Sequence, residues 1–185
     1  MNWRRKKQIT NLVGGILECN VLNRPPIELV FDIMNQRDIK FKELNENDDE
    51  FCGVYIVLNN VKMIFVNSNL YPPRKNFTIA HELGHHFLAH PLQDGAIICN
   101  KEIIFGNNKS EFEKEADFFA ACFLMPEKLV RQKVEELKED YSKQLDIHDS
   151  TDKQLINSEI INRLCDLFKV SKESMRYRLE ELNII

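Results

Sequence analysis

Residues 76–90 read NFTIAHELGHHFLAH, and this stretch decides the fold of the chain. It contains the pattern His-Glu-x-x-His, which runs from His81 to His85. Residues four apart lie on one face of a helix, so both imidazoles can reach a single metal ion. Two imidazoles suit zinc, and the carboxylate beside them suits a general base. The pattern therefore predicts that His81 and His85 bind the metal and that Glu82 is the catalytic residue.

The surroundings of the motif are apolar or small. Apart from histidines, no charged residue occurs between Lys75 and Glu82, or between Glu82 and Asp94. A helix of this composition is expected inside a hydrophobic core rather than on the surface. We therefore expect one Zn²⁺ per chain in a buried setting, with Mn²⁺ or another divalent ion as the alternative cofactor.

The composition of the whole chain narrows its class. Apolar residues make up 43% and charged residues 29% of 185 residues, as in an ordinary globular protein. The net charge of −4 argues against binding nucleic acid through the overall field. No apolar run is long enough to span a membrane, and the basic residues 4–7 are not followed by a signal-peptide pattern. Five scattered cysteines without a C-x-x-C pair indicate buried free thiols, so we expect a cytoplasmic protein.

Hydrophobic periodicity predicts two helices and a small sheet before the motif. The helices cover residues 8–18 and a segment that begins at Pro26 and closes at 36–38. Three strands follow, over 39–44, 53–58 and 61–66, and Asn59-Asn60 marks a two-residue hairpin. Residues 71–73 are predicted to form a turn before the metal helix, and 96–105 a short strand or hairpin.

The rest of the chain is predicted to be helical. Ser110 is a good N-cap for a helix that runs to Leu124, and Glu113 follows it as in a capping box. Further helices are expected from Pro126 and over 155–168 and 171–182, with a polar linker at 146–153. The sequence thus predicts an α+β fold in two parts: residues 1–126 hold the metal helix and a three-stranded sheet, and residues 127–185 form a helical extension with a helix-turn-helix-like end.

The third metal ligand must come from outside the motif. In one known class of zinc peptidase the third ligand is a histidine at position 91, and a glycine is needed at position 88. This chain has Leu88 and Pro91 instead. The other known class takes a glutamate from a later helix. The candidates are Glu111, Glu113 and Glu115.

Helix geometry ranks these candidates. Glu113 lies on the same side as Ala116 and Ala120, whose small side chains would allow a close approach to the metal helix. Glu111 lies on the far side, and Glu115 remains the second choice. Asp117 follows Glu113 by one turn, where its carboxylate could accept a hydrogen bond from a ligand imidazole.

Other polar residues near the motif receive weaker interpretations. His86 is expected off the metal face, in packing or at the surface, and His90 is expected to act through its charge at the helix C-terminus. An oxyanion donor beside the metal could be Tyr55, Tyr71 or Arg74. For Arg74, a structural pairing with a carboxylate at the helix start is favoured.

The two motifs together resemble those of the ImmA/IrrE family of metallopeptidases. Residues 74–85, RKNFTIAHELGH, are similar to its R-x-x-F-T-x-A-H-E-L-G-H, and residues 113–126, EKEADFFAACFLMP, to its E-x-x-A-N-x-F-A-A-x-L-L-M-P. Asp117 and Phe123 stand where Asn and Leu are common. The resemblance extends from about residue 10 to the end, and its alignment supports Glu113 as ligand over Glu115.

The resemblance implies a small zincin-like domain of the gluzincin type and a zinc-dependent endopeptidase. It further implies an anti-repressor, which would cleave a specific helix-turn-helix transcriptional repressor in a mobile-element or stress-response locus. Two alternatives are a metal-binding regulator without turnover and a DNA-binding protein. Residues 155–182 carry five basic and five acidic residues, which leaves no excess charge to attract phosphates and argues against direct nucleic-acid binding.

Overall fold

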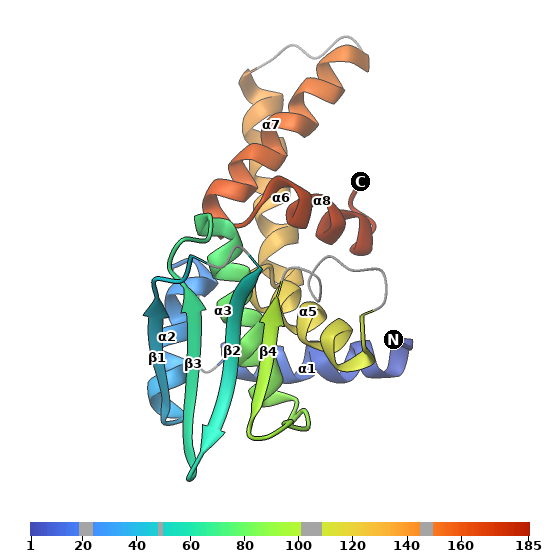
Figure 1. Cartoon of the computed structure of the whole chain (residues 1–185). Coiled ribbons are helices and arrows are strands. Elements are labelled where there is room, and N and C mark those ends of the chain that lie inside the picture. The colour runs from blue at the N-terminus through green and yellow to red at the C-terminus, as the bar shows by residue number, and fades with distance from the viewer. Residues whose placement is uncertain (19–23, 48–49, 101–108, 145–149) are drawn as a thin grey trace.

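The chain is built around a mixed four-stranded sheet. A computed structural model describes residues 1–18, 24–47, 50–100, 109–144 and 150–185. The strand order is β1-β3-β2-β4; β2 pairs antiparallel with β3 and with β4, whereas β1 runs parallel to β3 (Figure 1). The sheet therefore has one strand more than the three expected. The bounds are β1 Ile39–Leu44, β2 Phe51–Leu58, β3 Val61–Asn67 and β4 Ala96–Asn100.

The predicted hairpin joins β2 and β3. Leu58 pairs with Val61, so the loop consists of Asn59 and Asn60 alone, with φ angles of 49° and 64°. Two consecutive positive φ angles are typical of a type I′ turn, which matches the twist of the strands. The fourth strand, β4, lies within the segment 96–105 that was expected to hold a strand or hairpin; residues 101–108 lie outside the described part.

The metal helix, α3 Pro72–Phe87, covers one face of this sheet. It contacts β2 and β3, and α2 Pro26–Gln36 contacts β1 beside it (Figure 1). All eight residues from 78 to 85 are buried, so the helix is enclosed on every side. The expected turn at 71–73 is wrong at Pro72 and Pro73, because both prolines form the first turn of α3, where a missing N–H costs nothing.

One helix covers α3 on the side away from the sheet, and a second helix covers the first. α5 Glu111–Leu124 packs against α3, where Gly84 lies so close to Phe119 that a Cβ at Gly84 would be 3.1–3.2 Å from its side chain. Ser110 caps α5 as predicted, since its hydroxyl accepts from the N–H of Glu113. α1 Trp3–Glu18 packs against α5 and is five residues longer at its start than predicted.

The C-terminal part is helical. α6 Glu127–Gln144 and α7 Ser150–Phe168 extend away from the sheet as a pair, and α8 Lys172–Glu181 turns back toward α5 (Figure 1). α7 already begins at Ser150, so the predicted linker is helical over 150–153; residues 145–149 are not described. Arg178 of α8 is buried and donates from Nε to the carbonyl of Met125 at 3.0 Å, which ties α8 to the end of α5. None of the described helices is long and apolar enough to cross a bilayer.

Candidate metal centre

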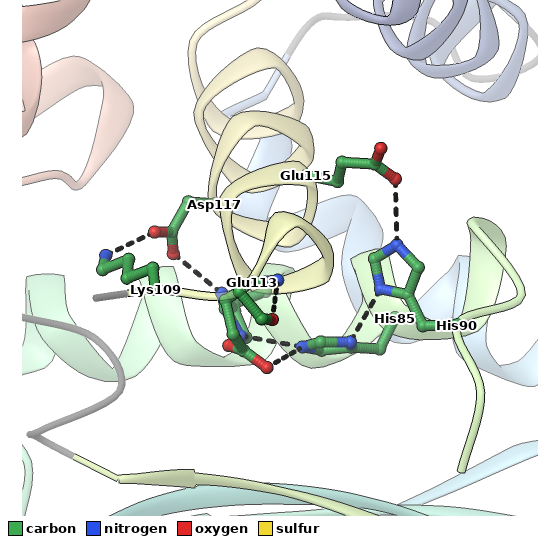
Figure 2. Close-up of polar contacts among 8 residues, drawn as sticks. His85, His90, Lys109, Glu113, Glu115 and Asp117 are labelled. Carbon is green, nitrogen blue, oxygen red and sulfur yellow. Dashed lines mark hydrogen bonds and ion pairs between the residues drawn. The ribbon is translucent and has the colours of Figure 1, made fainter. Parts of the chain in front are cut away.

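Three side chains from two helices converge on one point. His81 and His85 project from the buried part of α3. Glu113 projects from the first turn of α5 and faces His85 (Figure 2). The two Nε2 atoms lie 3.0 Å apart, and Glu113 Oε2 is 3.1 Å from His81 Nε2. Its Oε1 is 3.5 Å from His85 Nε2. The three residues that the sequence ranked first are thus brought together.

This group fits a divalent metal ion. A tetrahedral ion with nitrogen and oxygen ligands about 2.1 Å away separates those ligand atoms by roughly 3.4 Å. The observed separations of 3.0 to 3.5 Å are close to that value. Glu113 is also held ionised: burial alone would raise its pKa, but the two imidazoles beside it outweigh burial and keep the pKa well below its usual range. A buried His-His-carboxylate set could therefore hold the ion.

Glu82 lies beside this group in an unusual state. Its side chain is fully buried, and neither carboxylate oxygen has a hydrogen-bond partner among the described residues. Burial, the largest effect, raises the pKa of this carboxyl to about 8. A buried acid without partners is costly unless a cation or a substrate compensates it. The carboxylate of Glu82 is thus a buried polar group that a bound metal and a substrate or water molecule would compensate.

Asp117 orients His81, the first candidate ligand. Nδ1 of His81 donates to Asp117 Oδ1 at 2.9 Å, which leaves Nε2 as the nitrogen that could bind a metal. Lys109 binds the other carboxylate oxygen at 2.5 Å. The predicted position of Asp117 is therefore seen in the structure, and Lys109 adds a cation behind it that the sequence did not indicate.

His90 contacts His85, the second candidate ligand, and the sequence did not indicate this contact. His90 is buried, and its Nδ1 lies 2.8 Å from Nδ1 of His85. Its Nε2 lies 3.2 Å from Glu115 Oε2 (Figure 2). Glu115 in turn pairs with Arg5 of α1. Burial lowers the pKa of His90, which disfavours the charged form that is expected at the helix C-terminus.

The other two glutamates of α5 are directed away from the metal group. Glu115 contacts His90 and Arg5 rather than His81 or His85. Glu111 is exposed and pairs with Lys114 and with the amino group of Met1. Neither carboxylate belongs to the described metal group, so Glu113 is favoured among the three.

The candidate oxyanion donors are differently placed. The Tyr55 hydroxyl is engaged with His86, with 2.8 Å between the oxygen and Nδ1. Tyr71 is exposed at the start of α3. Arg74 donates from Nη2 to the sulfur of Cys52 at 3.1 Å. The role of Arg74 at the helix start stays a prediction, and His86 is a packing residue off the metal face, as expected.

Cys99 is a further residue that the sequence did not single out. It lies on β4, and its sulfur is within 4.8 Å of ligand atoms of His81 and Glu82. Burial raises the pKa of this thiol to about 12, so it is a neutral neighbour. Only the pairing of β4 with β2 places Cys99 there, which no periodicity in the sequence shows. Cys52, Cys99 and Cys122 are buried as expected, whereas Cys165 is half-buried; Cys19 lies outside the described residues.

The arrangement defines the class of protein. A helix with His-Glu-x-x-His, packed on a small sheet and faced by a glutamate from the next helix, is a small zincin-like domain, here with a helical C-terminal part. A family model described as the IrrE N-terminal-like domain, Peptidase_M78, matches residues 26–180. The chain therefore belongs to this metallopeptidase-type family, and the resemblance read from the two motifs is confirmed.

Two other comparisons add less. A search among curated proteins gave no match. A solved structure described as a "Mycobacterium tuberculosis transcriptional regulator" is similar in fold, with a TM-score of 0.54 and 16% sequence identity over 96% of this chain. The match covers 47% of that structure, so this chain spans about half its length. At this identity the likeness concerns the fold alone.

Proposed function

We propose that the chain is a zinc-dependent endopeptidase in which His81, His85 and Glu113 hold the metal and Glu82 is the general base. The observation that carries this proposal is the carboxylate of Glu82, which is buried without a partner beside the metal group. A structural metal site would not need such a base. The family match supports the same reaction class.

Each residue has a distinct task in this mechanism. When bound, zinc supplies Lewis acidity toward a peptide carbonyl and toward water. Glu82 takes a proton from the attacking water and passes it to the leaving amine nitrogen. Asp117 keeps His81 in the tautomer that presents Nε2, through the 2.9 Å hydrogen bond at Nδ1. The enclosed position of the helix limits competing hydration of the carboxylate.

The proposed substrate is a protein, and specifically a helix-turn-helix repressor. This assignment rests on the family resemblance, and the description of the structural neighbour as a transcriptional regulator is in keeping with it. A groove of about 900 Å³ between α3, α5 and α8 reaches Asp117 and offers apolar contacts at Phe77, Phe118 and Tyr177. A folded partner could dock there while a segment of its chain enters the site.

The proposal is tested by comparing the wild type with Glu82→Gln. Both proteins would be expressed in cells of the source strain, and new protein N-termini would be quantified by mass spectrometry. We expect one new N-terminus within a helix-turn-helix protein in the wild type, and a rate about 10²–10⁴-fold lower in the variant. The variant should keep about one metal per chain. Equal cleavage by both proteins would refute the role of Glu82.

The alternative is a metal-binding or DNA-binding regulator without turnover, which the regulatory description of the structural neighbour favours. The charges of the C-terminal helices oppose DNA binding. Arg178 is buried and pairs with Glu181, and Arg163 pairs with Glu159. A gel shift with duplex DNA at increasing salt separates the two functions, because only a DNA-binding protein gives a shift that weakens steeply with salt.

A further inference from the structure

The two histidines of the metal centre are oriented in different ways. His81 donates directly to a carboxylate, Asp117, whose other oxygen binds Lys109. His85 instead faces a second imidazole, that of His90, and the carboxylate of Glu115 follows one step later (Figure 2). Arg5 supplies the cation behind Glu115. Behind each histidine there is thus a carboxylate and then a cation. His81 contacts its carboxylate directly, whereas His90 lies between His85 and the carboxylate of Glu115.

The end of α3 explains how His90 reaches His85. The N–H of His90 donates to the carbonyl of His85 at 3.1 Å, and the N–H of Ala89 donates to the carbonyl of His86 at 3.2 Å. This pair of bonds is the Schellman motif. It requires a left-handed residue, and Ala89 has a φ of 52°. The motif folds the chain back, so that the imidazole of His90 lies against that of His85, with 4.9 Å between ring centroids.

The partners determine where the protons lie. Glu115 is a carboxylate and can only accept, so Nε2 of His90 donates to it. A neutral His90 then presents Nδ1 as an acceptor, and Nδ1 of His85 donates to it at 2.8 Å. His85 is left with an unprotonated Nε2, the atom that faces Glu113 and His81. From Arg5 to Nδ1 of His85 each contact therefore has a donor and an acceptor, and the lone pair of His85 Nε2 faces other acceptors, an arrangement that a cation would satisfy.

We propose that His90, Glu115 and Arg5 form a positioning relay for His85, which fixes its tautomer and ring orientation and so sets the metal affinity of the centre. This inference rests on the proposed metal site, but it does not depend on peptidase turnover. Arg5 belongs to α1, which precedes the family match at residues 26–180. The relay therefore connects α1, which lies outside the residues matched by the family model, to the metal centre.

The first test measures metal affinity by competition with a chelator. His90→Phe keeps a ring but removes the acceptor, and we expect zinc affinity to fall about 10–100-fold. His90→Asn places an amide oxygen near the position of Nδ1 and should recover part of that loss. Glu115→Gln keeps the shape and loses the charge, and should give a smaller loss in the same direction.

A second measurement separates positioning from general stability. Cobalt-substituted protein reports ligand geometry in its visible d–d absorption, which a change in stability alone does not move. We expect His90→Phe to shift these bands. His86→Phe is the matched control: it also replaces a histidine near the end of α3 but contacts Tyr55 instead of a ligand, and should leave the cobalt bands in place.

The outcomes distinguish the relay from the function. If wild type and His90→Phe bind zinc equally and show the same cobalt bands, the relay is refuted while the metal centre stands. If the wild type binds no divalent metal, the metal centre and the relay are both refuted. If metal affinity falls as expected but no substrate is ever cleaved, only the proposed peptidase function fails.

Discussion

Gly53 on β2 lies directly against Glu82 on α3. A Cβ added at Gly53 would be 3.1 Å from Oε1 of Glu82 and 2.7 Å from Cγ2 of Thr78. The strand and the helix are therefore in contact through a position that has room for a hydrogen only. This contact places the carboxylate of Glu82 against the sheet.

Gly53→Ala should therefore perturb both stability and the position of Glu82. We expect the free energy of unfolding to fall by about 1–3 kcal/mol, as for other overpacked sites. Thr78→Ser removes Cγ2, so the double variant should recover part of that loss. Urea unfolding of the two single variants and the double variant measures the coupling; strictly additive effects would contradict the contact.

Gly14→Ala in α1 is the matched control for a glycine. No atom lies within 4 Å of a Cβ built at Gly14, and the position is inside a helix. We expect this change to stabilise the protein by about 0.5–1 kcal/mol, because alanine loses less backbone entropy in a helix. A loss of stability on the same scale as for Gly53→Ala would mean that the space around Gly14 is filled.

The three glutamates of α5 provide a graded test of the ligand assignment. Glu113→Gln should weaken zinc binding by more than the roughly 10–100-fold typical of an outer contact, because a first ligand loses its charge. Glu115→Gln should have the smaller effect expected of the relay, and Glu111→Gln none, since Glu111 is exposed and pairs with Lys114. Zinc titration of the three variants gives the order. Tight binding by Glu113→Gln would overturn the assignment.

The raised pKa of Glu82 predicts how the metal-free protein responds to pH. Unfolding returns this carboxyl from a pKa of about 8 to its ordinary value of 4.5. Between those values the folded state binds more protons than the unfolded state, so the contribution of Glu82 to stability falls as pH rises through this window. Glu82→Gln lacks this titration. In the presence of chelator, its stability relative to wild type should therefore increase from about pH 5 to about pH 8; a constant difference in urea unfolding would contradict the burial of an unpaired acid.

Much of the site follows from local sequence. Helical spacing places His81 and His85 on one face, and the same reasoning along 111–117 selects Glu113 and Asp117, which the structure brings to the imidazoles. The asparagine pair at 59–60 fixes the hairpin for a similar reason, since those residues tolerate positive φ. Each of these predictions depends on residues within a few turns of one another.

The remaining parts depend on long-range pairing or on atypical residues. Cys99 comes to the site only because β4 pairs with β2. The relay through His90 depends on a Schellman motif that carries Ala89 where glycine is usual, so the sequence shows no signal for it. Arg5 is more than a hundred residues from its partner Glu115. Neither hydrophobic periodicity nor helix-capping rules can predict contacts between residues so far apart in the sequence.

Residues 78–85 are enclosed on every side, and this limits which substitutions the segment can accept. In most helices an outward face is free to vary while the inward face is constrained. Here Gly84 is held by Phe119, Ile79 and Leu83 by the core, and His81 and His85 by the candidate metal centre. The segment at the middle of the packing also carries the candidate site, so a substitution in it affects both. Loss of activity by mutation here will often also mean loss of the folded chain, and only shape-matched replacements can separate the two.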